Sequence, residues 1–421
     1  MVTFALCTDG THGDVLPFVQ LGQALAARGH DAVLYSHAAY ARTAAQAGLR
    51  FVPTDTEDDY ARELADRRHL LLNVLGDVDR VADFYARNRV FEQTREEFHA
   101  LADLVRTRPA GDVVLVGRHT SRFSVLLVRE ALGVPTAWVC VTPTQHLGLP
   151  MTEWLYPKAL AQPMNAMRAT VGLPAITDWS AWLRSADLVL GLWPEWFDQA
   201  GQPLIPSAAA QTGPAVALAG FLPHDPAETG QLPAELAALV DDNTPAERRP
   251  VLVSGGSSQL LHDDWYAMAV EAAVRAGRTV VVTCPHRDLL PADLPHQVRW
   301  YPALPFATLM PRIAAVVHHG GILTSARAIA SGTPQVVLAH GADRPDNARR
   351  LRVLGLAEWL PAARWQVDAV AALIARVLAE PAYRQRAVAL ASTMDTTTAA
   401  TRACAHLEDM VGQPRRPPSR G

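Results

Sequence analysis

Two histidines followed by two glycines carry the clearest chemical signal in the sequence. The run His318-His319-Gly320-Gly321 follows an apolar stretch, Ile313–Val317, that is typical of a buried strand. Helix-like spacing begins at Thr324, so the turn should present free N–H groups and the positive end of a helix dipole. We predict an anion site in which one histidine and the two glycine N–H groups bind a phosphate. The alternative is a pair of core histidines, which this turn context disfavours.

A second segment able to do chemistry lies near the start of the chain. Residues 9–17, Asp-Gly-Thr-His-Gly-Asp-Val-Leu-Pro, connect a predicted strand at 2–7 to a helix that ends near Arg28. The glycines do not follow the GxGxxG pattern, so we exclude NAD binding. Asp14 is either a carboxylate that caps the first turn of the helix or a general base, and spacing alone favours the cap.

The elements around these segments predict an α/β protein of two domains. Apolar runs alternate with helix-like segments, which indicates parallel sheets with ligands beyond the carboxyl ends of the strands. Strands are predicted at 2–7, 31–36, 112–116, 136–141, 186–193, 250–253, 278–283, 298–301, 313–317 and 335–339, the run at 186–193 being the last of the first domain. Two helices are predicted between 367 and 410.

The length of the chain and the positions of its Pro- and Gly-rich segments set the predicted domain limits. A chain of 421 residues can form two domains of about 200 residues each, and Pro, Gly and Ala are frequent between 194 and 250. We predict an N-terminal domain at 1–205, a linker region at 206–249, a C-terminal domain at 250–410 and a disordered tail at 411–421.

Composition excludes several classes of function. The net charge is −4 and no basic stripe is visible, so nucleic acid is not expected as a partner. Four scattered cysteines without CxxC pairs or histidines at ligand spacing predict reduced, buried thiols, a cytoplasmic protein and no metal centre. No apolar run approaches the roughly 20 residues of a membrane span, and no signal peptide is visible. Nothing in the sequence indicates the oligomeric state.

The segment 311–350 resembles the donor-binding signature of nucleotide-sugar glycosyltransferases of the GT-B fold. It shares Val-Val-His-His-Gly-Gly, a following Thr, Gly-x-Pro-Gln and an Asp before Pro. The resemblance is strongest to the bacterial natural-product branch, which includes vancomycin-type and sterol glycosyltransferases. It implies two Rossmann-like domains that face each other across a cleft, with the last helix crossing back to the first domain. It also implies that the N-terminal domain at 1–205 binds the acceptor and that the C-terminal domain at 250–410 binds the nucleotide-sugar donor.

This resemblance also implies roles for individual residues. His319 would contact the donor pyrophosphate, with Gly320, Gly321 and Thr324 beside it. An Asp-Gln pair binds the sugar hydroxyls in the family, and the matching residues are Asp343 and Arg344. The sequence therefore departs from the pattern at Arg344, and again at Leu323, where the family has Gly.

Residues 9–17 resemble a Gly-Thr-Arg-Gly-Asp-Val-x-Pro segment of the same family. The resemblance implies that Asp14 is the catalytic base, with His12 as the alternative. Where a family member uses His as the base, a partner Asp often stands at the position of Gly117. A carboxylate base needs no partner to set a tautomer, so Gly117 agrees with Asp14 as the base.

Two further loops and a group of aromatic residues complete the predicted site. A Gly/Ser loop follows the strand at 250–253 and predicts a second phosphate contact through Ser257 or Ser258. The stretch from Leu304 to Phe306 resembles the nucleobase loop of the family, although Ala303 replaces its stacking aromatic residue; the possible substitutes are Trp300, Tyr301 and Phe306. Four aromatic residues either line an acceptor pocket or fill the core: Trp154, Tyr156, Trp179 and Trp182.

Together these features predict an inverting glycosyltransferase. It would move a sugar from a UDP- or dTDP-sugar to a hydroxyl of an apolar natural-product acceptor, such as a polyketide, peptide or sterol-like compound. The nucleotide sugar is a co-substrate, and no cofactor or metal is expected. The alternatives are another nucleotide-sugar reaction, such as epimerisation or donor hydrolysis, and a protein that binds the donor or a partner without turnover.

Overall fold

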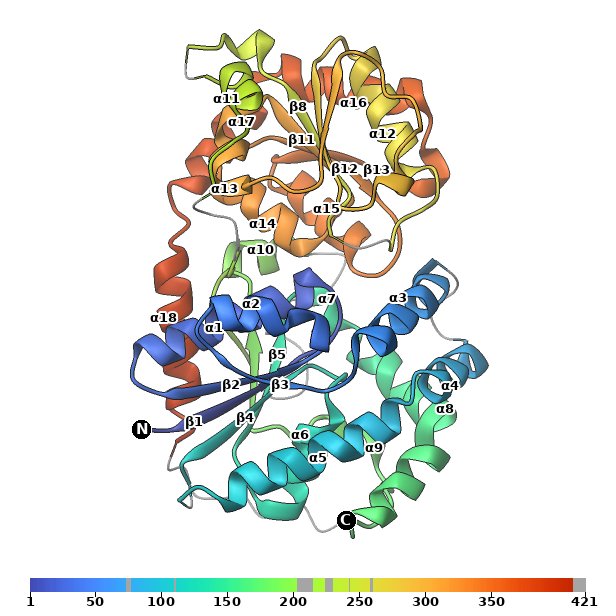
Figure 1. Ribbon diagram of the computed structural model, residues 1–421, viewed down its shortest axis with the longest axis vertical. Coiled ribbons are helices and arrows are strands. Elements are labelled where there is room, and N and C mark those ends of the chain that lie inside the picture. The colour runs from blue at the N-terminus through green and yellow to red at the C-terminus, as the bar shows by residue number, and fades with distance from the viewer. Residues whose placement is uncertain are drawn as a thin grey trace. The chain divides into compact units, whose positions relative to one another are not determined.

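A computed structural model describes residues 1–72, 77–109, 111–202, 215–223, 230–241, 243–257 and 260–411. The chain forms two compact units, each with one parallel sheet (Figure 1). As far as they are described, Met1–Asp198, Gln202–Leu222 and Thr396–Gly421 make up the first unit. The second consists of Gln199–Gly201 and Pro223–Asp395.

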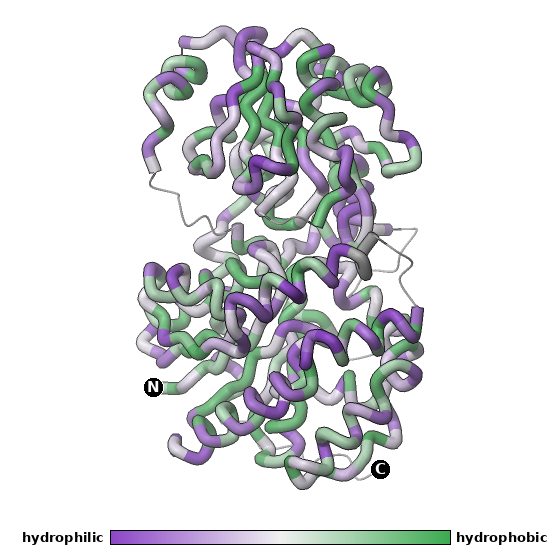
Figure 2. The backbone as a smooth tube through the Cα atoms, turned by 45° about the vertical axis from the view of Figure 1, so that its right-hand side comes forward, coloured by the Kyte–Doolittle hydropathy of each residue, from purple (hydrophilic) through white to green (hydrophobic). Residues whose placement is uncertain are grey.

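The first unit is built on a seven-stranded parallel sheet in the order β3-β2-β1-β4-β5-β6-β7. The strands are β1 (Thr3–Cys7), β2 (Asp31–Ser36), β3 (Arg50–Pro53), β4 (Val113–Arg118), β5 (Thr136–Cys140), β6 (Leu188–Gly191) and β7 (Val216–Leu218). The central strands are apolar on both faces, as expected of a sheet covered by helices on both sides (Figure 2). The strand order reverses between β1 and β4, so the loops after these two strands lie side by side.

Helices cover the first sheet and include the last helix of the chain. They are α1 (His12–Ala27), α2 (Ala41–Gln46), α3 (Glu57–Leu72), α4 (Val78–Arg87), α5 (Val90–Arg106), α6 (Phe123–Leu132), α7 (Pro143–Leu147), α8 (Leu149–Thr170), α9 (Trp179–Leu183), α10 (Glu195–Gln199) and α18 (Thr396–Glu408). Helix α18 packs against α1. Arg28, just after α1, donates two hydrogen bonds of 2.7 Å to Glu408. The end of the described chain is thereby part of the first unit.

The second unit repeats the same topology with six parallel strands in the order β10-β9-β8-β11-β12-β13. The strands are β8 (Val251–Ser254), β9 (Val280–Thr283), β10 (Val298–Tyr301), β11 (Ala315–His318), β12 (Gln335–Ala339) and β13 (Ala357–Pro361). The helices are α11 (Ala234–Leu239), α12 (Trp265–Arg275), α13 (Phe306–Leu309), α14 (Ile322–Ala330), α15 (Arg344–Val353), α16 (Val367–Ala379) and α17 (Pro381–Ala391). Here the order reverses between β8 and β11, which brings the loops after these strands together.

Alternation along the strands builds two cores in the second unit, one on each face of its sheet. Val251 and Val253 on β8 pack with Trp265 of α12 and Val370 of α16. Leu252, between those two valines, belongs to the core on the opposite face. This arrangement follows from the period of two in a strand. A βαβ unit formed by β11, α14 and β12 confirms the one predicted around the paired histidines.

The sequence-based prediction misses the edge strands β3 and β13, and two further details of it are wrong. The run at 186–193 is not the last strand of the first sheet, because β7 pairs with β6 and places Ala217 beside Leu190. A strand of three residues in a segment rich in Pro, Gly and Ala gives little periodic signal. The end of the chain forms three helices instead of two, because Pro381 begins a new helix after α16. The segment predicted as a linker, where described, holds β7 and α11, and residues 412–421 of the predicted tail lie outside the described residues.

Two expectations from composition can be compared with the structure. All four cysteines are free and buried, as predicted. Within the described part of the chain, no helix is both long enough and apolar enough to cross a membrane.

Candidate active site

The turn after β11 is held by His318. Its ring is buried, Nδ1 accepts a hydrogen bond of 3.2 Å from the Gly320 N–H, and Nε2 lies 3.0 Å from the Gln335 side-chain oxygen. These partners place the proton of the ring on Nε2. Burial lowers the pKa of His318 to about 4, so the ring is neutral at physiological pH. Because the Gly320 N–H is engaged by His318, a bound phosphate would use the following N–H groups of the turn and of α14.

Gly320 connects this turn to the start of α15. Its φ is 94°, and a Cβ on Gly320 would lie 3.0 Å from the Arg344 carbonyl oxygen. The Asn347 amide donates to the Gly320 carbonyl at 3.0 Å and to Asp343 at 2.8 Å. Any side chain at 320 would therefore push the turn away from α15.

His319 lies between two glycines from neighbouring loops. A Cβ on Gly256, in the loop after β8, would lie 2.7 Å from Cε1 of His319, and a Cβ on Gly321 would collide with its Nε2. Burial lowers the pKa of His319 well below its usual value, the charge of Arg344 and the ring of His318 lower it further, and the Ser254 backbone opposes them. His319 is therefore a neutral hydrogen-bonding group where the loops after β8 and β11 meet.

Some of the other residues predicted to bind the nucleotide-sugar donor lie near the point where the loops after β8 and β11 meet. Thr324 lies in the first turn of α14 and is buried, and Asp343 is the residue before α15. Ser257 is half-buried in the loop after β8, whereas Ser258 lies outside the described residues. Leu304 is buried in one core of the second unit. Its packing gives it a structural role there.

Each possible substitute for the missing stacking aromatic residue is held by its own neighbours. The Trp300 indole donates to the Cys284 carbonyl at 2.9 Å, and the Tyr301 hydroxyl donates to Glu235 at 2.8 Å. Phe306 is buried in the same core as Leu304. None of these contacts selects one of the three as the residue that stacks on a base.

In the first unit, both oxygens of the Asp14 carboxylate have protein partners. Oδ2 accepts a hydrogen bond of 3.1 Å from the Thr11 N–H at the start of α1. Oδ1 lies 2.8 Å from Nη2 of Arg118, and the Gln145 amide lies 3.5 Å from the same oxygen. The capping contact predicted for Asp14 is present. About 20% of the side chain stays exposed, so a substrate can reach it.

Gly10 makes room for this carboxylate. Its φ is 102°, and a Cβ at this position would lie 2.5 Å from Oδ2 of Asp14. The Gly10 N–H donates to Nε2 of His37 at 2.9 Å, and the Tyr60 hydroxyl donates to the Gly10 carbonyl at 3.1 Å. Nδ1 of His37 contacts Asp55, after β3, at 2.6 Å, so both ring nitrogens have partners. His37 thus positions the segment and is not available as a base.

Sequence reasoning missed Arg118. This arginine ends β4, and its Nη1 contacts Oδ1 of Asp9 at 3.1 Å and the Ser121 hydroxyl at 3.2 Å. Burial alone would raise the pKa of Asp9, but the charges of Arg118 and Arg67 hold it far below its usual value. Asp9 therefore binds Arg118 as a carboxylate, and Asp14 contacts the same guanidinium. The signal that could have identified Arg118 from the sequence is its position at the carboxyl end of the predicted strand that pairs with β1.

The structure also places His12 and Gly117. His12 is the first residue of α1 and is exposed, with its ring 5.5 Å from that of Tyr40. A Cβ on Gly117 would lie 2.6 Å from Val125 and 2.9 Å from Trp138. Because position 117 points into the core, it has no room for a carboxylate.

Three residues with metal-ligand side chains meet in the first unit, although they are far apart in sequence. Ligand atoms of His119, Cys140 and His146 all lie within 4.8 Å of one another, and all three residues are buried. Burial lowers the pKa of His119 to about 3, and the neighbouring His146 and Arg118 lower it further. The positive charge of Arg118 also opposes a divalent cation, so we assign no metal to this cluster.

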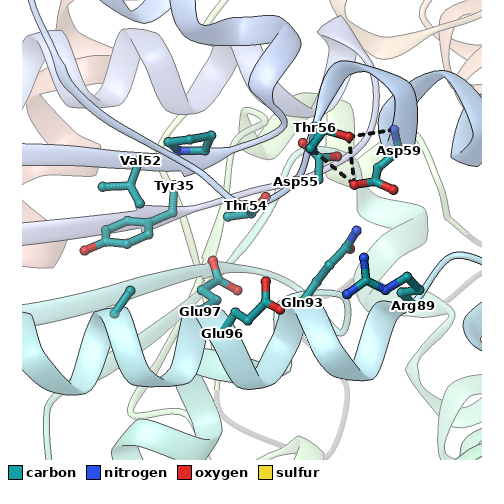
Figure 3. A pocket seen from close by; sticks show the side chains of 12 residues that line it. Tyr35, Val52, Thr54, Asp55, Thr56, Asp59, Arg89, Gln93, Glu96 and Glu97 are labelled. Atoms are coloured by element: carbon teal, nitrogen blue, oxygen red, sulfur yellow. Dashed lines mark hydrogen bonds between the residues drawn. The ribbon is translucent and has the colours of Figure 1, made fainter.

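A cavity of about 300 Å³ lies between α5 and the loop after β3 (Figure 3). Arg89, Gln93, Glu96 and Glu97 line it from the side of the helix, and Tyr35 lines it together with residues between 52 and 59. Neither His12 nor Asp14 is part of the lining. We therefore place no acceptor in this cavity.

The aromatic residues considered for an acceptor pocket differ in their surroundings. Trp179 and Trp182 pack against each other with ring centroids 5.7 Å apart, and Trp182 also packs against Phe123. Tyr156 donates a hydrogen bond of 3.3 Å to the Thr120 carbonyl. Trp154 is exposed on α8. Interior contacts thus account for Trp179, Trp182 and Tyr156. The Lys158 ammonium lies 3.6 Å from the centroid of the Trp154 ring, and the ring is half exposed to solvent.

Comparison with known proteins agrees with this architecture. Residues 267–410 match the family model described as the erythromycin biosynthesis protein CIII-like C-terminal domain. The O-mycaminosyltylonolide 6-deoxyallosyltransferase of Streptomyces fradiae is 29% identical over 435 residues, covering 96% of each chain. The vancomycin aglycone glucosyltransferase of Amycolatopsis orientalis is 27% identical over 427 residues, covering 94% of this chain and 95% of the relative.

Solved structures share the whole fold. The glycosyltransferase of kitacinnamycin has a TM-score of 0.71 at 20% identity, covering 97% of this chain and 99% of the other. The glycosyltransferase VinC, solved in complex with dTDP, has a TM-score of 0.70 at 19% identity, covering 98% of this chain and all of the other. Two Rossmann-like domains of this kind define the GT-B class of glycosyltransferases. The chain is a glycosyltransferase, and it is similar to glycosyltransferases of antibiotic biosynthesis over almost its whole length. The predicted fold and enzyme class are confirmed.

Proposed function

We propose that this enzyme transfers a sugar from a dTDP- or UDP-sugar to a hydroxyl of a natural product, with inversion at the anomeric carbon. The observation that carries the proposal is the position of His319, between Gly256 and Gly321 at the point where the order of the second sheet reverses. Open α/β sheets bind their ligands at such points, and the first turn of α14 adds N–H groups that suit a phosphate. A solved relative in the fold comparison binds dTDP, which supports a nucleotide diphosphate as the ligand.

The proposed reaction uses a carboxylate base and a hydrogen-bonded leaving group. A carboxylate oxygen of Asp14 takes the proton of the acceptor hydroxyl, after giving up its contact with Thr11 or Arg118. The acceptor oxygen attacks the anomeric carbon, and the bond to the diphosphate oxygen breaks on the opposite face. The electron pair leaves with the diphosphate, and His319 and the N–H groups of α14 stabilise it. The nucleotide sugar is a co-substrate, and this reaction needs neither a cofactor nor a metal.

Two exposed apolar residues on α8 form a candidate acceptor surface. Met151 and Trp154 are exposed apolar residues on α8, three positions apart and therefore on the same side of the helix. Such a surface suits an apolar acceptor. Two relatives are named for the acceptors O-mycaminosyltylonolide and vancomycin aglycone. We propose that α8 contributes to acceptor binding.

A panel assay tests the proposed function. The full-length enzyme is mixed with several dTDP- and UDP-sugars, with and without a set of polyketide and peptide aglycones, and products are followed by mass spectrometry and by NMR of the anomeric proton. We expect transfer that requires the acceptor and inverts the anomeric configuration. Release of free sugar without acceptor would indicate a hydrolase, and an epimerised donor would indicate an epimerase. Donor binding without turnover across the panel would contradict transfer.

His319→Ala should weaken binding of dTDP or UDP by about 1.5–3 kcal/mol, the range for a hydrogen bond to a charged group. The fold should tolerate the change, since the turn is held by His318 and Asn347. Because the pKa of His319 is lowered, its ring stays neutral between pH 6 and 8, and affinity should not rise with protonation of this group. Calorimetric titration measures both properties, and equal affinity in a folded variant would remove His319 from the site.

A further inference from the structure

Among the buried arginines of the described residues, Arg344 differs from the others in its ion pairing. Arg122, Arg168 and Arg350 each have a carboxylate oxygen between 2.5 and 2.7 Å from the guanidinium. Arg344 is only 9% exposed, and its guanidinium donates a hydrogen bond of 3.2 Å to the His340 carbonyl. No carboxylate of the described residues lies within ion-pair distance of it, and the negative charge of Asp343 acts on it from farther away. A guanidinium stays charged in proteins, so a buried one without a carboxylate is costly.

The position of this charge is next to His319. Arg344 is the first residue of α15, and its backbone and Cβ lie against Gly320 in the histidine turn. The proximity of the two side chains is also visible in the lowered pKa of His319, where Arg344 is the largest influence after burial. Asp346, which could have paired with Arg344, binds Arg349 at 2.9 Å and Arg350 at 2.7 Å.

Both histidines of the turn are neutral, so they offer hydrogen bonds but no positive charge. The α14 N-terminus contributes only the partial charge of a helix dipole. Arg344 is therefore the full cation that the second unit places beside His319. An anion bound there would gain a charge-assisted contact, and a guanidinium can make it with two N–H groups.

We infer that Arg344 is the cationic ligand of the donor diphosphate and stabilises it as the glycosidic bond breaks. This inference rests on the proposed function. The bond between the anomeric carbon and the diphosphate oxygen breaks heterolytically, and the electron pair stays on that oxygen. The departing diphosphate thus gains a negative charge, and a fixed guanidinium at the site stabilises it more than the glutamine usual in the family would.

A distinctive consequence is that one substitution changes stability and affinity in opposite directions. Arg344→Gln removes a buried charge that lacks a carboxylate, so the ligand-free protein should melt at a higher temperature. The same substitution should weaken dTDP or UDP binding by about 10- to 150-fold, the equivalent of one hydrogen bond to a charged group. A residue with only a structural role would lower the melting temperature or leave the affinity unchanged.

The experiment compares wild type, Arg344→Gln, Arg344→Lys and Arg349→Gln in calorimetric titrations with dTDP, UDP, thymidine and uridine. Arg349 is the matched control, because it lies on the same helix and is paired with Asp346. We expect a loss of diphosphate affinity in Arg344→Gln, a partial recovery in Arg344→Lys, and no change for Arg349→Gln. Nucleoside affinity should be the same in all four proteins.

The outcomes separate this inference from the function on which it rests. If wild type binds dTDP or UDP and Arg344→Gln binds it equally well, Arg344 has no role at the diphosphate and the proposed function stands. If wild type binds neither nucleotide, both the proposed function and the role of Arg344 are overturned. A loss in Arg344→Gln that extends equally to thymidine and uridine would also overturn the role, because it would show a general change in the site.

Discussion

Asp14→Asn should produce a folded protein that binds the nucleotide donor but transfers sugar about 10²–10⁴-fold more slowly, the range for loss of a general base. The amide has the same shape as the carboxylate, and its oxygen can still accept a hydrogen bond from the Thr11 N–H or from Arg118. It cannot take a proton from an acceptor hydroxyl at neutral pH. The measurement is single-turnover transfer with a donor and acceptor identified in the panel assay.

His12→Ala is the matched comparison for this prediction, because His12 is in the same helical turn and is exposed. We expect it to retain most of the transfer rate. Thermal melting of both variants controls for folding, since Asn at position 14 also removes the charge that faces Arg118. Normal turnover by Asp14→Asn together with an inactive His12→Ala would identify His12 as the base.

Arg118→Met should lower the free energy of unfolding by about 3–5 kcal/mol, the range for breaking a buried ion pair from one side. Arg118 is 14% exposed and lies between the carboxylates of Asp9 and Asp14. Without it, Asp9 keeps Arg67, at 3.5 Å, as its nearest cation. Denaturant unfolding measures the loss, and Arg106→Met is the control, because Arg106 and its partner Asp103 are both largely exposed.

The pH dependence of this variant follows from the lowered pKa of Asp9. A carboxyl with a depressed pKa in the folded state stabilises the protein above its unfolded value, about 3.9, and the contribution is lost as the pH falls below that value. In Arg118→Met the depression is smaller, so the variant should unfold at a higher pH than wild type during acid titration. An unchanged acid midpoint, or a stability loss no larger than that of Arg106→Met, would show that Arg118 does not support Asp9.

The sequence by itself determined the local elements and the class of the protein. β2, β10 and β12 have the bounds predicted for them, because short runs of apolar, β-branched or aromatic residues between turn residues specify strands without reference to distant partners. The His-His-Gly-Gly turn was found because a strand end, two glycines and a helix start are adjacent in the chain. The capping contact of Asp14 is equally local, since Thr11 is three residues away.

Tertiary structure decided which polar groups pair. Arg118 reaches Asp14 only because β4 lies beside β1, and nothing in either segment alone specifies that contact. The Gly320 N–H is used by His318 because the buried ring turns toward it, a matter of rotamer and packing. Arg344 could have formed an ion pair with Asp346, but that carboxylate is bound by Arg349 and Arg350. Hydrogen bonds and ion pairs depend on distances of a few ångströms between side chains, and those distances are set by how the elements pack, which residue spacing along the chain does not specify.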